Sequence, residues 1–155
     1  SNPLHRMYLE KLLWRQITMN IRKLGAFVVA YFVITMAWAY PWHMVLFHDL
    51  YVQMGAFQRA APIMPLGITA ILIQGIVIGY LYPFFYKGQS SVRQGIVFNL
   101  IIGLMTYTAM GFATAAKFQI EPVSTFLLYH TVFQFIQFTL TGAALGFIFK
   151  ENKEV

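Results

Sequence analysis

The chain contains no cysteine and few charged residues. The missing cysteine excludes disulfides, thiolate catalysis, covalent haem attachment and Cys-ligated zinc or iron–sulfur clusters within this chain. Charged residues make up 10% of the 155 positions, whereas a soluble globular domain has about 25%. Hydrophobic residues make up 59%. This composition predicts that residues 1–155 form a single membrane domain.

Recognisable catalytic motifs are also absent. The sequence has no P-loop, no His-Glu-x-x-His and no Gly-x-Ser-x-Gly. Its apolar runs carry no Asp, Glu, Lys or Arg, which a proton-coupled transporter or an ion pump usually needs. The first residues lack the apolar core and cleavage site of a signal peptide, so none is expected there. An enzyme is therefore the less favoured interpretation.

Four apolar runs are long enough to cross a bilayer, which takes about 20 helical residues. They cover residues 25–47, 63–86, 95–116 and 123–149. In residues 1–24, apolar and basic side chains fall on opposite sides of a helix, which predicts an amphipathic helix at the headgroups. The two sides are Leu9, Leu13, Ile17, Ile21 and Leu24 against Lys11, Arg15, Thr18 and Arg22. The expected fold is all-α: a four-helix transmembrane bundle preceded by an N-terminal amphipathic interfacial helix.

Basic residues are distributed unevenly along this topology. Nine of the eleven Lys and Arg residues fall on the side of the termini, and only Arg59 and Lys117 fall on the other side. By the positive-inside rule, both termini are expected to be cytoplasmic. The net charge of +6 is thus explained by topology, and nucleic acid is not expected as a partner.

Small residues mark two helix-packing faces. Gly75 and Gly79 form a Gly-x-x-x-Gly pair in the second span, and Gly142 and Gly146 form one in the fourth. Such pairs let helix backbones approach closely. The spacing does not decide between packing inside the bundle and packing between protomers.

A second face of the fourth span is polar. His130, Gln134, Gln137 and Thr141 fall within about 60° of one another on a 3.6-residue helix. Polar groups avoid hydrocarbon, so this stripe should face the interior. Its expected partners are Gln74, Asn99 and Thr106. Interhelical hydrogen bonding is the favoured interpretation, and a polar pocket or narrow pathway is the alternative.

The stretch "MAWAYPWHMVLFHDLY", residues 36 to 51, ends the first span. Pro41 predicts a kink near Ala37. The aromatic side chains are expected to form an interfacial belt. These side chains are Trp38, Tyr40, Trp42 and Tyr51.

Two histidines lie at similar predicted depths, about 9 and 12 Å below the outer boundary. They are His43 and His130. If spans one and four touch, the two imidazoles could bind haem, a quinone or a divalent metal. His48 and Asp49 lie above them and complete a candidate set of metal ligands.

The segments "WHMVLFHDLY" and "YKGQSSVRQGIVFNLIIGL" resemble small bacterial four-span membrane proteins of unknown function. The positions that match this pattern are His43, Tyr51, Lys87, Gly88, Gly95 and Gly103. The resemblance implies a bacterial inner-membrane location and no particular activity.

Three functions follow from these observations. The first is a non-enzymatic integral membrane protein, either an accessory subunit of a larger complex or a small homo-oligomer. The second is binding of haem, metal or quinone through His43 and His130. The third is a small channel or carrier along the polar stripe of the fourth span.

Overall fold

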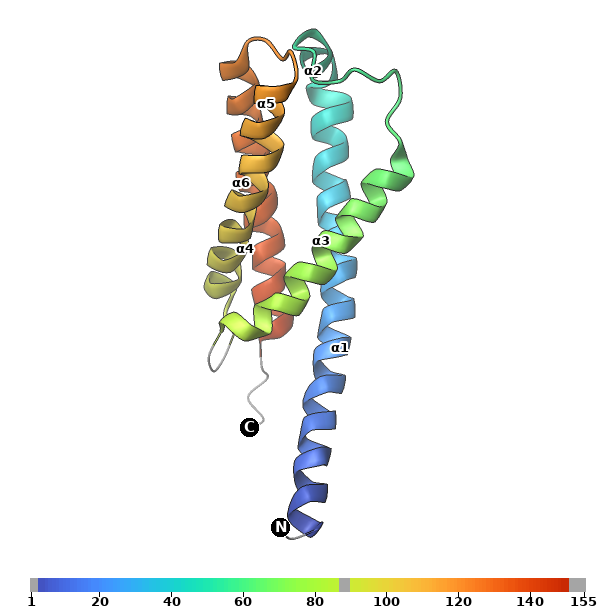
Figure 1. The fold of residues 1–155 in the computed structure, drawn as a ribbon, viewed down its shortest axis with the longest axis vertical. Helices are drawn as coiled ribbons and strands as arrows, with labels where there is room; N and C mark the ends of the chain where they lie inside the picture. Colours follow the sequence, from blue (N-terminus) through green and yellow to red (C-terminus); the bar gives the residue numbers. More distant parts are fainter. Residues whose placement is uncertain (1–2, 87–89, 151–155) are drawn as a thin grey trace.

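The computed structural model describes residues 3–86 and 90–150, with the backbone alone for residues 11–20. Within this part of the chain every regular element is a helix (Figure 1). The elements are α1 (Pro3–Tyr40), the π-helix η1 (Pro41–Leu46), α2 (His48–Gln53), α3 (Met64–Phe85), α4 (Val92–Tyr107), the π-helix η2 (Thr108–Phe112), α5 (Ala113–Lys117) and α6 (Val123–Phe149).

Four of the described segments are long and apolar enough to cross a membrane. They are Ile21–Leu46, Met64–Phe85, Val92–Lys117 and Val123–Phe149. The first three differ from their predicted spans by only a few residues, and the fourth coincides with its prediction. The prediction of an all-α bundle with four membrane-spanning helices is thus confirmed.

The spans alternate in direction, so α1 begins and α6 ends toward the same end of the molecule (Figure 1). We call this the basic end, because it carries most of the described basic side chains. These are Arg6, Arg22, Lys23, Arg93 and Lys150. We call the other end, which carries α2 and α5, the distal end (Figure 1). Arg59 and Lys117 are its described cations.

The predicted helix before the first span is present, and it continues into that span without a break. Its first part extends well beyond the other helices (Figure 1). Several residues named above lie outside the described structure. They are Lys87 and Gly88, together with the side chains of Lys11, Leu13, Arg15, Ile17 and Thr18.

Helices α4 and α6 pack with their backbones in direct contact. A methyl group added at Gly142 would stand 2.8 Å from Ile96 Cα, and one at Gly146 would stand 2.7 Å from Val92 Cα. A methyl group at Gly95 would overlap the backbone of Gly142 and Gly146. Only glycine fits these three positions without moving a helix, so the pair in α6 packs inside the bundle.

Helix α3 uses its own glycine pair against α1. Gly75 faces the Tyr31 side chain, which a methyl group would approach at 3.3 Å. Gly79 faces Leu24 and Phe27. Both predicted glycine pairs therefore serve packing within one chain.

Replacement of Gly95 by alanine should destabilise the protein. The added methyl group has to separate α4 from α6, and overpacking of this kind costs about 1–3 kcal/mol. Gly25→Ala is the matched control, since a methyl group there meets nothing within 4 Å. Thermal unfolding in detergent should show a lower midpoint for Gly95→Ala only. Equal midpoints for the two variants would contradict the packing described here.

Candidate functional site

Buried polar side chains connect the four spans near their middle. The Asn99 Nδ2 of α4 donates to Thr141 Oγ1 at 2.7 Å and to the Phe138 carbonyl at 2.9 Å, both in α6. Gln137 Nε2 of α6 reaches Thr35 Oγ1 of α1 at 3.5 Å. These bonds give Asn99 Nδ2 and Gln137 Nε2 the partners that polar groups need in an apolar environment. Asn99 Oδ1 is buried without a hydrogen-bond partner among the described residues.

One more bond extends the network to the remaining span. The Tyr31 hydroxyl of α1 donates to Gln74 Oε1 of α3 at 2.9 Å. Gln74 therefore bonds to α1 and not to the polar stripe of α6. Thr106 donates within its own helix, to the Ile102 carbonyl at 2.7 Å.

The polar stripe of α6 does not line one continuous pathway. Gln137 and Thr141 are buried and engaged in the bonds just described. Gln134 instead lines a cavity of about 200 Å³ between α4 and α6. His130 is buried between aromatic rings. This arrangement favours interhelical bonding over conduction.

His43, which is half-buried, and His130, which is buried, lie in the distal half, next to the two π-helices. His43 belongs to η1, and a methyl group at Gly111 of η2 would stand 3.2 Å from His130 Cδ2. The ring centre of Phe133 lies 4.4 Å from that of His43 and 6.5 Å from that of His130. The histidines thus share one aromatic neighbour, as expected if spans one and four touch.

The four proposed metal ligands do not form one site. Within the described residues, no three His, Asp or Glu side chains come close enough to hold a metal ion. His48 Nδ1 lies 3.3 Å from Oδ1 of its neighbour Asp49, and its ring contacts Phe57. The His48 and Asp49 side chains are both exposed, and the structure does not bring them together with His43 and His130.

A haem site between the two imidazoles is not supported either. The rings of Tyr107 and Phe126 stack on His130, with ring centres at 5.7 and 5.5 Å. The Nε2 atom of His130 lies 3.4 Å from Gln134 Nε2. Neither histidine lines the cavity beside Gln134 or the larger cavities at the two ends of the bundle. His130 is therefore surrounded like a packed core histidine, whereas His43 is half-buried and its Nδ1 has no hydrogen-bond partner among the described residues.

The aromatic residues that end the first span are mainly core residues. Trp42 and Tyr51 are buried, and Trp42 Nε1 donates to the Tyr51 hydroxyl at 3.2 Å. Trp38 Nε1 donates to the Phe133 carbonyl at 3.2 Å. The predicted interfacial belt is therefore wrong for Trp42 and Tyr51, while Tyr40 is exposed. The predicted disturbance by Pro41 takes the form of the π-helix η1, which begins at this proline.

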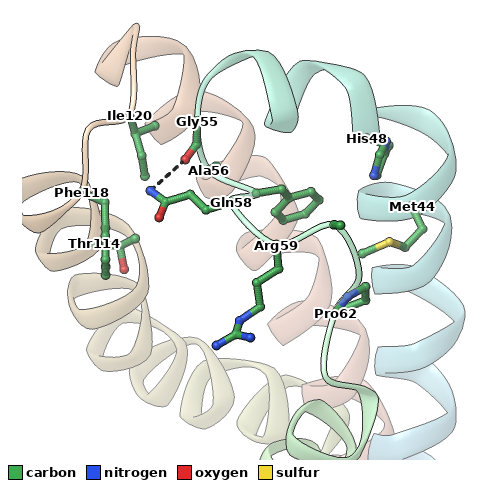
Figure 2. Close-up of a pocket in the computed structure, with 12 residues that line it drawn as sticks. Met44, His48, Gly55, Ala56, Gln58, Arg59, Pro62, Thr114, Phe118 and Ile120 are labelled. Atoms are coloured by element: carbon green, nitrogen blue, oxygen red, sulfur yellow. Dashed lines mark hydrogen bonds between the residues drawn. The ribbon is translucent and has the colours of Figure 1, made fainter.

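The strongest candidate site is a cavity of about 340 Å³ at the distal end, which we call the distal cavity (Figure 2). It lies between the end of the first span, the turn after α2, and α5. Its walls are mostly apolar, and a few polar side chains enter it. The lining residues are Met44, His48, Gly55, Ala56, Phe57, Gln58, Arg59, Ala60, Pro62, Thr114, Phe118 and Ile120.

Main-chain bonds fix the rim of the distal cavity. Glu121 N donates to the Met54 carbonyl at 3.0 Å, and Ala56 N donates to the Tyr51 carbonyl at 2.9 Å. Gly55 has a φ of 78°, and a methyl group there would stand 2.7 Å from the Gln119 carbonyl oxygen. A positive φ and this close approach both favour glycine. The turns that precede α3 and α6 are thereby held together.

Arg59 supplies the charge of the distal cavity. Figure 2 shows its side chain extending from the loop into the hollow, with the guanidinium in the open space. Among the residues that the structure describes, Arg59 forms no ion pair. Gln58 Nε2 donates to the Gly55 carbonyl at 3.5 Å, the dashed line in Figure 2. A lone cation in a mostly apolar hollow is suited to an anion with an apolar body.

The residues of this loop are not among the sites predicted from the sequence. Arg59 entered only the count of basic residues on each side of the membrane. One signal was available, since Arg59 and Lys117 are the only cations expected on the outer side. The cavity itself depends on how the loop folds against α5, which no local pattern reveals.

Comparisons with known proteins add no relative. The chain matches no protein-family model, and neither the curated proteins nor the solved structures include a match to it.

Replacement of Tyr51 by phenylalanine tests the bond inside the distal aromatic cluster. Loss of the bond to Trp42 should lower the free energy of unfolding by about 1 kcal/mol. Burial raises the pKa of the Tyr51 phenol from its ordinary value of 10.0. The native state therefore loses stability as the pH rises above about 10, and Tyr51→Phe should weaken this dependence.

Denaturant unfolding at pH 7 and at alkaline pH measures both effects. The exposed Tyr40→Phe provides the control and should change neither quantity. Identical pH profiles for wild type and Tyr51→Phe would contradict the burial of this phenol.

Proposed function

We propose that this chain is a non-enzymatic integral membrane protein that binds a small organic anion in its distal cavity. The observation that carries the proposal is the Arg59 guanidinium, which stands without an ion pair, among the described residues, in a hollow of about 340 Å³. Ligand cavities typically measure about 300–1,000 Å³ and combine apolar walls with a few polar groups. The distal cavity has both properties.

The chemistry of the lining defines the ligand class. A guanidinium binds carboxylate, sulfonate or phosphate through two parallel N–H donors. Thr114 and Gln58 add groups able to form hydrogen bonds. Phe57, Phe118 and Ile120 form an apolar surface for the rest of the ligand. An anion with an aromatic or aliphatic body of modest size fits this combination.

Orientation places the distal cavity on the outer side of the membrane in this proposal. The basic end is cytoplasmic by the positive-inside rule, which leaves the distal end facing out. We propose that this membrane is the bacterial inner membrane, as the resemblance of the two quoted segments implies. The ligand would then come from the periplasm or the external medium.

A role as accessory subunit or small homo-oligomer is part of the same proposal. Helix α1 extends beyond the other helices at the basic end (Figure 1). Met7 and Tyr8 on this extension are exposed beside the cation Arg6. Such a surface suits anionic headgroups or a partner at the cytoplasmic face. The glycine pairs pack inside the bundle, so they do not supply contacts between protomers.

Binding of 4-phenylbutyrate tests the role of Arg59. Arg59→Gln should weaken binding about tenfold, since a charged hydrogen bond contributes about 1.5 kcal/mol or more. Lys117→Gln is the matched control, because it removes the other distal cation, which does not line the cavity. Its affinity should change less than twofold. Isothermal titration calorimetry in nanodiscs measures all three proteins.

The neutral amide of the same compound separates charge recognition from apolar binding. Its affinity should be equal in wild type and Arg59→Gln. If Arg59→Gln and Lys117→Gln weaken phenylbutyrate binding equally, the attraction is general electrostatics, which would contradict a site at Arg59. Undetectable binding to the wild type would exclude this ligand class.

The absence of native cysteine makes the orientation directly testable. Asp49→Cys lies at the distal end and Lys150→Cys at the basic end, and both positions are exposed. In intact spheroplasts, a membrane-impermeant maleimide should label Asp49→Cys but not Lys150→Cys. Lysis should make both equally reactive. Labelling of Lys150→Cys but not Asp49→Cys would show the opposite topology. Equal labelling of both variants in intact spheroplasts would contradict a bundle that spans the membrane.

A further inference from the structure

A second open cavity lies at the basic end, between the end of α3 and the start of α4. Its volume is about 530 Å³, and we call it the basic-end groove. It is separate from the distal cavity, and the two have no lining residue in common. It plays no part in the anion binding proposed above.

The wall of the groove is aromatic and rigidly supported. The ring centres of Phe85 and Phe98 lie 4.8 Å apart, and those of Tyr82 and Phe98 lie 5.3 Å apart. The Tyr82 hydroxyl and Ser90 Oγ are 2.6 Å apart, and Ser90 Oγ donates to the Gly146 carbonyl at 3.2 Å. These bonds attach the wall to α6. The groove is therefore built by the fold and does not depend on one flexible side chain.

Polarity changes along the groove in one direction. Arg93, Val97 and Ile101 are spaced four residues apart and line it from one face of α4. With a rise of about 1.5 Å per residue, Val97 and Ile101 lie about 6 and 12 Å deeper in the membrane than Arg93. The groove thus has a cationic entrance at the interface and an apolar interior.

The polar groups at the entrance are available for a ligand. Arg93 is exposed and forms no ion pair with any residue of the described structure. The Gln94 Oε1 accepts from Ser91 N at 2.9 Å, so its Nε2 remains the donor that this side chain can offer. A guanidinium and an amide N–H suit a phosphate oxygen.

We propose that the basic-end groove binds one anionic phospholipid from the leaflet at this end. The phosphodiester lies at Arg93 and Gln94, and one acyl chain follows Val97 and Ile101 against the rings of Phe85 and Phe98. This occupant uses both parts of the groove. A free phosphate would use only the entrance and leave the aromatic wall without a function.

The headgroup decides which lipid is preferred. An acyl chain gains little by moving from bulk lipid into the groove, because both surroundings are apolar. The charge at Arg93 separates anionic from zwitterionic headgroups, and one basic residue near a membrane surface contributes about 1 kcal/mol, or about fivefold. We therefore expect about a fivefold preference for phosphatidylglycerol over phosphatidylcholine of equal chain length.

Native mass spectrometry of the detergent-purified full chain tests this preference. The wild type titrated with each lipid should bind one phosphatidylglycerol about five times more tightly than phosphatidylcholine. Arg93→Gln should remove the preference and leave phosphatidylcholine binding unchanged. Arg22→Gln is the matched control, an exposed arginine at the same end that does not line the groove, and it should keep the preference.

Two further measurements distinguish a lipid in the groove from a free phosphate at its entrance. Ile101→Trp should obstruct the path of the acyl chain and weaken the binding of both lipids. Thermal unfolding verifies that this variant folds. Inorganic phosphate at millimolar concentration should not displace phosphatidylglycerol. Displacement of the lipid by phosphate would overturn the proposal. An equal loss of the phosphatidylglycerol preference in Arg22→Gln and Arg93→Gln would also overturn it, as would unaltered lipid binding in a folded Ile101→Trp. None of these outcomes involves Arg59, so the distal site is tested independently.

Discussion

The close approach of α4 and α6 is the constraint on which the rest of the bundle depends. Surrounding lipid is as apolar as leucine, so the hydrophobic effect does not hold helices together in a membrane. Attraction between them then depends on how many atoms come into van der Waals contact. Glycine at positions 95, 142 and 146 removes the side chains that would hold the two backbones apart. Helix α6 gains a neighbour along its length and can then present its other face to α1.

The same approach brings the polar groups within reach of one another. Asn99 can donate to the Phe138 carbonyl only because α4 lies so near the backbone of α6. The partners on the other side, Thr35 and Gln137, join α6 to α1 in turn. A shift of one helix along its neighbour would leave several polar groups unpaired in hydrocarbon. Apolar packing thus sets the distance between helices, and hydrogen bonds set their register.

The sequence predicts the spans well, because the length of an apolar run is a local property. Burial at the distal end could not be read in this way. Trp42 and Tyr51 have the composition of an interfacial belt, yet the turn after α2 covers them and makes them core residues. The distal cavity was likewise hidden from the sequence, since it joins Arg59 to Thr114, residues brought together only by the packed turns. A single side-chain pattern carries no information on such long-range contacts.

Helix α3 has a property that follows from the position of Gly75. This glycine sits near the middle of α3 and rests on Tyr31 of α1. The segment that leads into α3 borders the distal cavity at Pro62, and its last turns border the basic-end groove at Tyr82 and Phe85. A tilt of α3 about this contact would therefore move its two ends in opposite directions. One helix thus runs between the distal cavity and the basic-end groove, at opposite ends of the bundle.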